Sequence, residues 1–345
     1  MTQFSGAHRS LLVMACLVII FAGIKLASEI VTPFILAAFI AIICSPLLHA
    51  LGKFRIPKGL AIVLIIMMVV GVTFSIAGLV GQSVNDFSKQ LPEYKAQLQD
   101  KFVWLVNWAA QYGVPIDKQQ LLKLFDPSQL FDVATIMLAG FGGVMANIFL
   151  ILLTVVFMLF EAPMLHKKVH LALDDPEMKM QAIDRFLNSI NSYLAIKTLV
   201  SLATGVAVSL FLWALGLDYF VLWGLVAFLL NYIPNIGSII AAIPAVLLAL
   251  VTLGAWQAGV VAIGYVVVNT VMGNIIEPRY MGKGLGLSTL VVFLSLIFWG
   301  WLLGTVGMLL SVPLTMIVKI ALENTERGRW LAVMLGNTDE AADAQ

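Results

Sequence analysis

The feature that most constrains this chain is a series of long apolar runs that carry almost no charge. Of its 345 residues, 61% are hydrophobic and 11% are charged, and the mean hydropathy is +1.00. Soluble domains are only about half apolar. A helix needs roughly 20 predominantly apolar residues to cross the ~30 Å hydrocarbon layer of a bilayer. The runs therefore predict an all-α integral membrane protein in contact with lipid.

The pattern divides into eight hydrophobic segments. They lie at about 10–28, 30–48, 59–81, 136–160, 198–217, 219–252, 255–276 and 287–319. The sixth and the eighth are too long for one span, and each is interrupted, at 231–235 and at 299–304. Such a break is tolerated at membrane depth only where protein or water covers it. Each long segment is therefore interpreted either as two tight spans or as a re-entrant helical hairpin.

The orientation follows from the basic residues of the short loops, which stay in the cytoplasm. Lysine and arginine gather at 53–58, 167–185, 279–283 and 319–329. All four stretches are cytoplasmic if both broken segments return to the face from which they start. The N-terminus and the C-terminus are then both cytoplasmic, and residues 82–135 lie outside.

The outer segment contains an apolar stripe with helical spacing. Its residues are Phe87, Leu91, Tyr94, Leu98, Phe102 and Leu105, and charged residues occupy positions between them. This pattern predicts an amphipathic helix that ends before Gly113 and Pro115. Two interpretations stay open: the helix lies on the bilayer surface or on its own subunit, or its heptad-like steps form a contact between subunits of a homo-oligomer.

The two broken segments resemble each other. Leu-Gly-Leu opens both, at 215–217 and at 285–287, and 21 residues separate Gly216 from Gly237 and Gly286 from Gly307. If each segment is a hairpin, the single span at 255–276 makes the pair an inverted repeat. Several secondary transporters build a midplane substrate site from such broken helices. The alternative is chance, because Gly and Pro are common in membrane helices.

These observations predict five parts of the chain. Residues 1–81 hold N-terminal transmembrane helices, and 82–135 form an extracytoplasmic helical insertion. Residues 136–197 hold a transmembrane helix and a cytoplasmic loop, 198–322 a transport core with both broken segments, and 323–345 a cytoplasmic tail.

Motifs of soluble enzymes are missing from the sequence. It has no Walker loop, no dinucleotide fingerprint and no His-Glu-x-x-His. We therefore expect no enzyme activity and no cofactor. The four histidines, dispersed near membrane ends and in loops, do not predict a metal site. The net charge of +1 gives no reason to expect a nucleic-acid partner.

Polar groups at the breaks are the candidate substrate path. Amide and phenol groups can hydrogen-bond a hydroxylated solute without the desolvation penalty of an ion. The alternative is a helix-breaking turn satisfied by its own groups. The candidates are Asn231, Tyr232, Pro234, Asn235 and Gly237, with Gly304 and Gly307 from the second broken segment.

Charged residues near this core are few enough to consider singly. Asp218, the one charge between Lys197 and Glu277, opens the sixth segment, where we expect an N-cap and, alternatively, a coupling residue. Glu277 and Arg279 follow a polar strip at Asn269 and Asn274. They are interpreted either as an interfacial ion pair that ends the helix or as a cytoplasmic gate with a proton-linked carboxylate.

Several of these strings together resemble the autoinducer-2 exporter family of bacterial membrane proteins. The resemblance covers nearly the whole chain, beginning at Pro33-Phe34-Ile35-Leu36 and Ser45-Pro46-Leu47. Its central motifs are Asn231-Tyr232-Ile233-Pro234-Asn235-Ile236-Gly237, Ala242-Ile243-Pro244-Ala245 and Asn274-Ile275-Ile276-Glu277-Pro278-Arg279-Tyr280-Met281-Gly282, continuing through Gly286, Gly307 and Pro313.

The resemblance implies efflux of autoinducer-2, a small polar furanone used in quorum sensing, across the bacterial inner membrane. Many members carry His-Pro where this chain has Ser288-Thr289, and the run 286–295 instead looks like the subgroup named for exporting the signal. Other members are described as sodium or lithium to proton antiporters, which makes antiport the first alternative. A scaffold or regulator of membrane assembly that transports nothing is the second.

Overall fold

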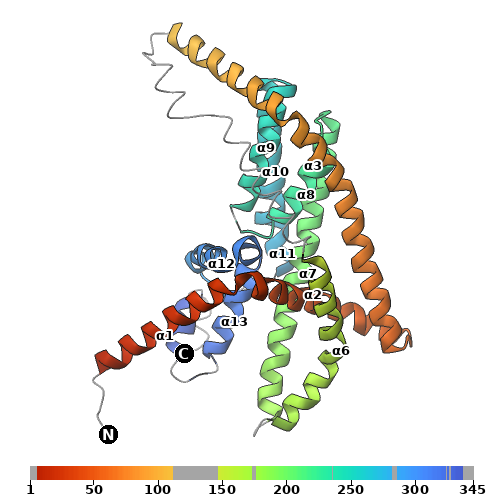
Figure 1. The fold of residues 1–345 in the computed structure, drawn as a ribbon, viewed down its shortest axis with the longest axis vertical. Helices are drawn as coiled ribbons and strands as arrows, with labels where there is room; N and C mark the ends of the chain where they lie inside the picture. The colour runs from red at the N-terminus through yellow and green to blue at the C-terminus, as the bar shows by residue number, and fades with distance from the viewer. Residues whose placement is uncertain are drawn as a thin grey trace. The chain divides into compact units, whose positions relative to one another are not determined.

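The computed structural model describes residues 6–111, 147–172, 176–234, 236–281, 286–323, 325 and 328–336, and every regular element among them is helical (Figure 1). The helices of the first half are α1 (Gly6–Leu26), α2 (Ser28–Lys53), α3 (Lys58–Gln111), α6 (Ile148–Ala172) and α7 (Pro176–Ala214). Then come α8 (Phe220–Leu230), α9 (Gly237–Thr252), α10 (Ala255–Asn269), η2 (Thr270–Ile276) and α11 (Glu277–Met281). The chain ends with α12 (Thr289–Leu309), α13 (Ser311–Glu323) and α14 (Arg329–Leu335). The predicted all-α class is confirmed.

Five of the described helices are long and apolar enough to cross a membrane. They are Ser28–Lys53, Lys58–Trp104, Leu187–Ala214, Ala255–Tyr280 and Thr289–Leu309. Shorter apolar helices lie at Leu11–Leu26, Ile148–Glu161, Phe220–Leu230 and Gly237–Thr252. Each predicted segment thus contains an apolar helix, because backbone groups in lipid must satisfy one another within the segment. The number of complete spans stays a prediction.

The chain forms two compact units. The first, unit 1, comprises Met1–Ile66, Asn147–Asn191 and Leu285–Gln345. The second, unit 2, comprises Met67–Ala146 and Ser192–Gly284. The two broken segments belong to different units, since α8 and α9 lie in unit 2 whereas α12 and α13 lie in unit 1.

Unit 1 packs α2 against α6 and α12, and α12 against α13. Gly304 interrupts α12 with a φ of 67° and a ψ of −147°, at the break predicted for 299–304. The indole nitrogen of Trp299 donates a 2.9 Å hydrogen bond to the hydroxyl of Thr315 and so ties α12 to α13. At the end of α1, the Lys25 ammonium donates to the backbone carbonyl of Trp301. The second broken segment is therefore held to its neighbours by polar contacts around its kink.

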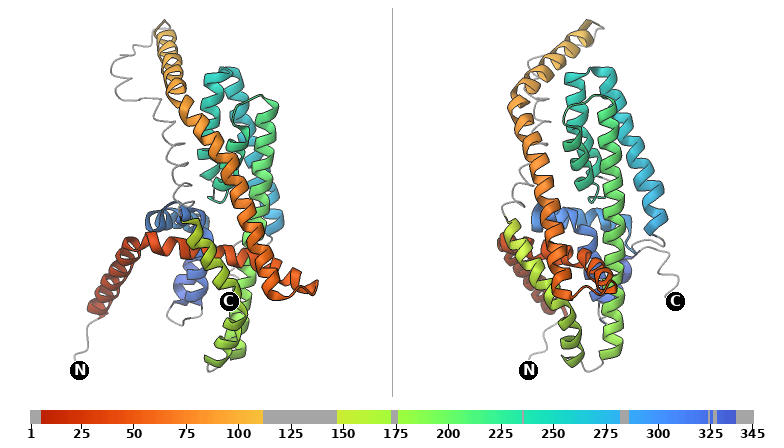
Figure 2. Two further views of the ribbon diagram at one scale, coloured as in Figure 1. Left: turned by 45° about the vertical axis from the view of Figure 1, so that its right-hand side comes forward. Right: turned by 90° about the vertical axis from the view of Figure 1, so that its right-hand side faces the viewer.

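Unit 2 is built around α9, which packs against both α8 and α10, and Figure 2 shows these three helices grouped together. α8 ends at Leu230 and α9 begins at Gly237, so the interruption lies where the sequence predicts the first break. Three alanines and one leucine are fully buried on α9: Ala241, Ala245, Leu248 and Ala249. These mostly small side chains let the helices approach closely, as is common between membrane helices.

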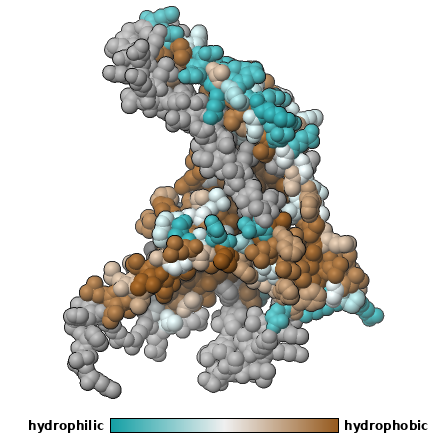
Figure 3. Space-filling model, viewed as in Figure 1, coloured by the Kyte–Doolittle hydropathy of each residue, from teal (hydrophilic) through white to brown (hydrophobic). Residues whose placement is uncertain are grey.

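The C-terminal part of α3 is amphipathic, as predicted. Phe87, Tyr94 and Leu98 are buried, and Figure 3 shows hydrophilic side chains gathered along this part of the helix. The Phe87 ring lies 5.9 Å from that of Tyr219 and 5.3 Å from that of Trp223. The stripe thus packs partly on its own chain. The helix runs without a break through residue 82, where the insertion was predicted to begin, and it ends at Gln111.

Candidate functional site

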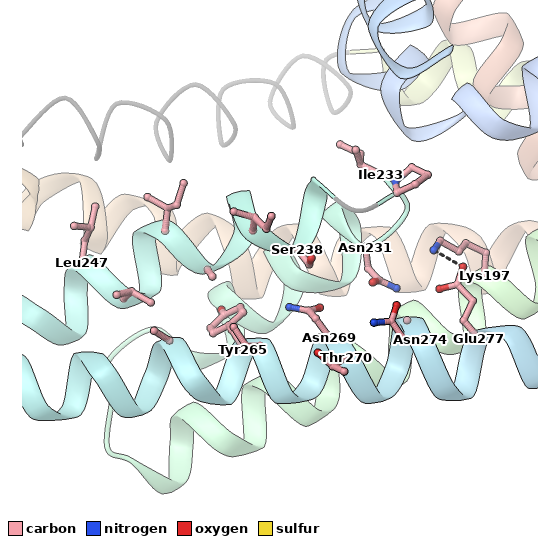
Figure 4. Close-up of a pocket in the computed structure, with 18 residues that line it drawn as sticks. Lys197, Asn231, Ile233, Ser238, Leu247, Tyr265, Asn269, Thr270, Asn274 and Glu277 are labelled. Atoms are coloured by element: carbon pink, nitrogen blue, oxygen red, sulfur yellow. Dashed lines mark hydrogen bonds and ion pairs between the residues drawn. The ribbon is translucent and has the colours of Figure 1, made fainter. Parts of the chain in front are cut away.

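A cavity of about 700 Å³ lies in unit 2, within the ~300–1,000 Å³ range of small-molecule sites. Its wall comes from one residue of α7, the turn after α8, and one face each of α9 and the continuous α10–η2–α11 stretch. Figure 4 shows these side chains pointing into the space between α9 and α10. Every described lining residue belongs to unit 2.

The cavity is apolar at one end and polar at the other. Leu247 and its apolar neighbours on α9 form the first end (Figure 4). Asn231, Asn269 and Asn274 converge toward the second, so that each of three elements supplies one carboxamide. A carboxamide offers two donors and one acceptor oxygen, so the polar end suits a neutral solute with hydroxyl or carbonyl groups.

The turn after α8 is held by hydrogen bonds to α7. Asn231 Nδ2 donates to Ser201 Oγ at 2.9 Å, and the Tyr232 hydroxyl donates to Thr198 Oγ1 at 2.7 Å. Pro234 has no backbone donor and cannot continue the helix. Asn231 and Pro234 line the cavity. Tyr232 ties the turn to α7 through its hydroxyl, which favours a structural role for this residue.

Gly237 begins α9 at a close crossing of backbone. A Cβ at this position would lie 1.9 Å from the carbonyl oxygen of Leu230, the last residue of α8. Only a residue without a side chain fits there. Gly237 therefore shapes the turn that presents Asn231, although it does not itself line the cavity.

The other polar wall includes a π-helical turn. Residues 270–276 form η2 between α10 and α11, and Thr270, Gly273 and Asn274 of this turn line the cavity. A π turn widens the helix by one residue per turn and occurs often at functional sites. The π turn rotates the residues after it relative to their positions in a regular α-helix. Asn269, Asn274 and Glu277, which the sequence predicts as a polar strip, all line the cavity.

An ion pair occupies the polar end. Lys197 Nζ lies 2.7 Å from Glu277 Oε1, and the two side chains are 5% and 16% exposed. Sequence reasoning expected Glu277 to act with Arg279, which is exposed, and missed Lys197. One feature of the sequence could have indicated this pair: Lys197 and Glu277 are both charged residues within predominantly apolar helices, where such groups pair with one another.

The remaining candidates are placed as follows. Asp218 is exposed, and the expected N-cap role is wrong, because Tyr219 occupies the N-cap of α8 and no side chain caps the helix. The left-handed backbone of Tyr219, with a φ of 57°, turns the chain into the helix instead. Gly304 and Gly307 lie in α12 of unit 1. Asn235 lies outside the described residues.

Several apolar helices together with a solute-sized cavity of polar and apolar walls are typical of a multi-pass membrane transport protein. The sequence model of a protein family described as "AI-2E family transporter" matches residues 14–327. The chain therefore belongs to the AI-2E family of transporters.

Relatives align over almost their whole length. The AI-2 transport protein TqsA of Escherichia coli is 45% identical over 329 residues, which cover 95% of this chain and 96% of TqsA. A relative from Haemophilus influenzae is 46% identical over 96% of this chain and 97% of its own. YhhT of E. coli is 40% identical over 96% of this chain and 95% of its own. The names of the last two assign transport provisionally and give no substrate.

Proposed function

We propose that this chain is a secondary transporter that exports autoinducer-2 across the bacterial inner membrane through the cavity of unit 2. The observation that carries the proposal is the polar end of that cavity, where Asn231, Asn269 and Asn274 surround a space whose two charges, Lys197 and Glu277, neutralise each other. A small, neutral, oxygen-rich solute suits such a wall. The 45% identity to a protein named for AI-2 transport supports the same substrate.

The two broken segments are proposed to be re-entrant hairpins related as an inverted repeat. Gly216 and Gly286, 70 residues apart, both have positive φ, at 72° and 63°. A Cβ at Gly237 would lie 1.9 Å from the Leu230 carbonyl oxygen, and one at Gly307 would lie 2.0 Å from that of Trp299. Similar close approaches of Gly237 and Gly307 to a carbonyl about two helical turns earlier favour a repeat over chance.

In this proposal, the turn after α8 lines the substrate path, and the role of Gly304 and Gly307 in the second broken segment stays a prediction from the sequence. Glu277, with Arg279 beside it, gates the cytoplasmic side, and Asp218 stays a predicted coupling residue. Both termini are cytoplasmic, and residues 82–135 are extracytoplasmic. Phe87, at the start of the apolar stripe of α3, packs on its own chain. The rest of the stripe is proposed to form a contact between subunits of a homo-oligomer.

The test is flux from liposomes that contain only the purified protein and are loaded with autoinducer-2. We expect the wild-type protein to release autoinducer-2 faster than it leaks from loaded liposomes that contain no protein. Asn231→Ala should raise the half-saturating concentration about tenfold, because it removes a carboxamide that makes one or two hydrogen bonds of ~0.5–1.5 kcal/mol each. The transport rate as a function of autoinducer-2 concentration measures the change.

The matched control is Ser201→Ala, which removes the 2.9 Å hydrogen-bond partner of Asn231 but leaves its carboxamide in place. Ser201 is fully buried and does not line the cavity, so its loss should change the half-saturating concentration much less. Equal flux in the wild type and in Asn231→Ala would contradict the proposed path. Equal flux is also what the alternative of a scaffold without transport predicts.

A sodium or lithium to proton antiporter is the second candidate, and the Glu277 carboxylate in the cavity wall is the observation that favours it. Antiport requires a group that alternately binds and releases a proton, which glutamine cannot do. Glu277→Gln should therefore abolish sodium-dependent collapse of an imposed proton gradient, while autoinducer-2 efflux should persist in part. A wild type that collapses the gradient and releases no autoinducer-2 would establish antiport instead.

A further inference from the structure

The Tyr265 hydroxyl is a buried polar group whose hydrogen bond the protein does not supply. Tyr265 lies on α10 and is 2% exposed, and among the described residues its hydroxyl has no hydrogen-bond partner. Buried tyrosine hydroxyls usually have one, because an unsatisfied group keeps its full desolvation penalty. The same side chain lines the cavity. A group with these properties needs an explanation beyond packing.

Its position connects the two ends of the cavity. Tyr265 lies one helical turn before Asn269, so the two side chains share a face of α10. Figure 4 shows Tyr265 between Leu247 at the apolar end and the asparagines at the polar end, with Ser238 of α9 nearby. A ligand that contacts both ends must therefore pass the Tyr265 side chain.

Four polar side chains of this region differ from Tyr265 in having hydrogen-bond partners of their own within the protein: Lys197, Asn231, Tyr232 and Glu277. The amide of Asn231 bonds to Ser201, and the hydroxyl of Tyr232 bonds to Thr198. Lys197 and Glu277 bond to each other. Those groups contribute to stability without a solute, whereas the hydroxyl of Tyr265 contributes nothing to stability and still has a hydrogen bond to give.

We propose that Tyr265 is the specificity-determining residue that hydrogen-bonds a hydroxyl or carbonyl oxygen of a neutral, polyhydroxylated solute of furanose size. The ring of the solute lies against the apolar wall of α9, and its remaining oxygens face Asn269 and Asn274. This inference rests on the proposed function, because it names how the same cavity distinguishes a hydroxylated ring from an apolar one.

The experiment measures equilibrium binding to the purified full-length protein in lipid nanodiscs. The probes are autoinducer-2 and ribose, which carry hydroxyls, and tetrahydrofuran, a ring of similar size without them. Tyr265→Phe should weaken binding of both hydroxylated probes about tenfold, equivalent to ~1.4 kcal/mol, and leave binding of tetrahydrofuran unchanged. Its melting temperature should not fall, because phenylalanine removes an unsatisfied hydroxyl and keeps the ring.

Tyr94→Phe is the matched control. Tyr94 is a buried tyrosine of the same unit, its hydroxyl donates to Gln90 on its own helix, and it does not line the cavity. This change should alter binding of none of the three probes. A general effect of removing a tyrosine hydroxyl would appear in both variants, whereas a solute contact appears only in Tyr265→Phe.

Each outcome decides something. Equal affinity of the wild type and Tyr265→Phe for the hydroxylated probes overturns the inference, as does a wild type that binds none of them. If ribose binding depends on Tyr265 but liposomes release no autoinducer-2, the inference stands and the proposed substrate fails. If autoinducer-2 flux depends on Asn231 but not on Tyr265, the proposed function stands and the inference fails.

Discussion

Lys197→Met is expected to destabilise the protein by about 3–5 kcal/mol, the range seen when one partner of a buried ion pair is removed. The substitution leaves the Glu277 carboxylate, 16% exposed, without the ammonium that lies 2.7 Å away. A carboxylate taken out of water without a partner carries a large desolvation penalty. Thermal or denaturant unfolding of the purified protein in detergent, followed by circular dichroism, measures the loss.

The double variant Lys197→Met, Glu277→Leu separates the pair from its individual charges. Replacing both partners with apolar side chains is often neutral or stabilising, so most of the stability lost in the single variant should return. Arg279→Met is the matched control for removing a cation, because Arg279 is exposed, and its effect should stay within about 0.5 kcal/mol. A single variant as stable as the wild type would show that water or another group solvates Glu277.

Gly237→Ala is expected to cost at least about 3 kcal/mol of stability and to disrupt solute binding. The new Cβ would lie 1.9 Å from the Leu230 carbonyl oxygen, and backbone cannot move aside as a flexible side chain can. Ordinary overpacking costs ~1–3 kcal/mol, and a clash with backbone lies at or above the upper end of that range. Because the turn also positions Asn231, the affinity for autoinducer-2 should fall together with the unfolding temperature.

Gly259→Ala provides the comparison. Gly259 lies within α10, and a Cβ added there has no atom within 4 Å. In a helix interior alanine is favoured over glycine by ~1 kcal/mol, so this variant should be as stable as the wild type or more so. If Gly237→Ala and Gly259→Ala unfold at the same temperature, the backbone at Gly237 does not cross the Leu230 carbonyl closely.

The Lys197 and Gly237 variants concern different parts of one cavity. Lys197 and Glu277 determine the charge at its polar end, and Gly237 determines the path of the backbone that carries Asn231. A transporter needs a polar site within apolar surroundings, and each polar group there must be satisfied by protein, water or solute. Lys197 and Glu277 satisfy each other, and Asn231 and Tyr232 of the turn bond to α7. Among the described residues this leaves Asn269, Asn274 and Tyr265 available to a solute.

Local features of this protein follow from the sequence alone. The apolar segments became helices, and the breaks predicted at 231–235 and 299–304 coincide with the turn after α8 and with the kink at Gly304. Phe87, Tyr94 and Leu98 of the predicted stripe are buried on α3. These features depend on hydrogen bonds and steric limits within a few residues of each position, so periodicity, Gly and Pro are enough to predict them.

Tertiary structure alone decided how the polar groups are paired. Glu277 pairs with Lys197, 80 residues away, and not with its neighbour Arg279. Asn231 and Tyr232 bond to α7, whereas Tyr265, which the sequence does not distinguish from a core tyrosine, faces the cavity without a partner in the described part of the chain. These outcomes depend on which helices become neighbours and on their rotation about their own axes. Periodicity within one helix contains no information about either, because both are set by packing between segments far apart in the chain.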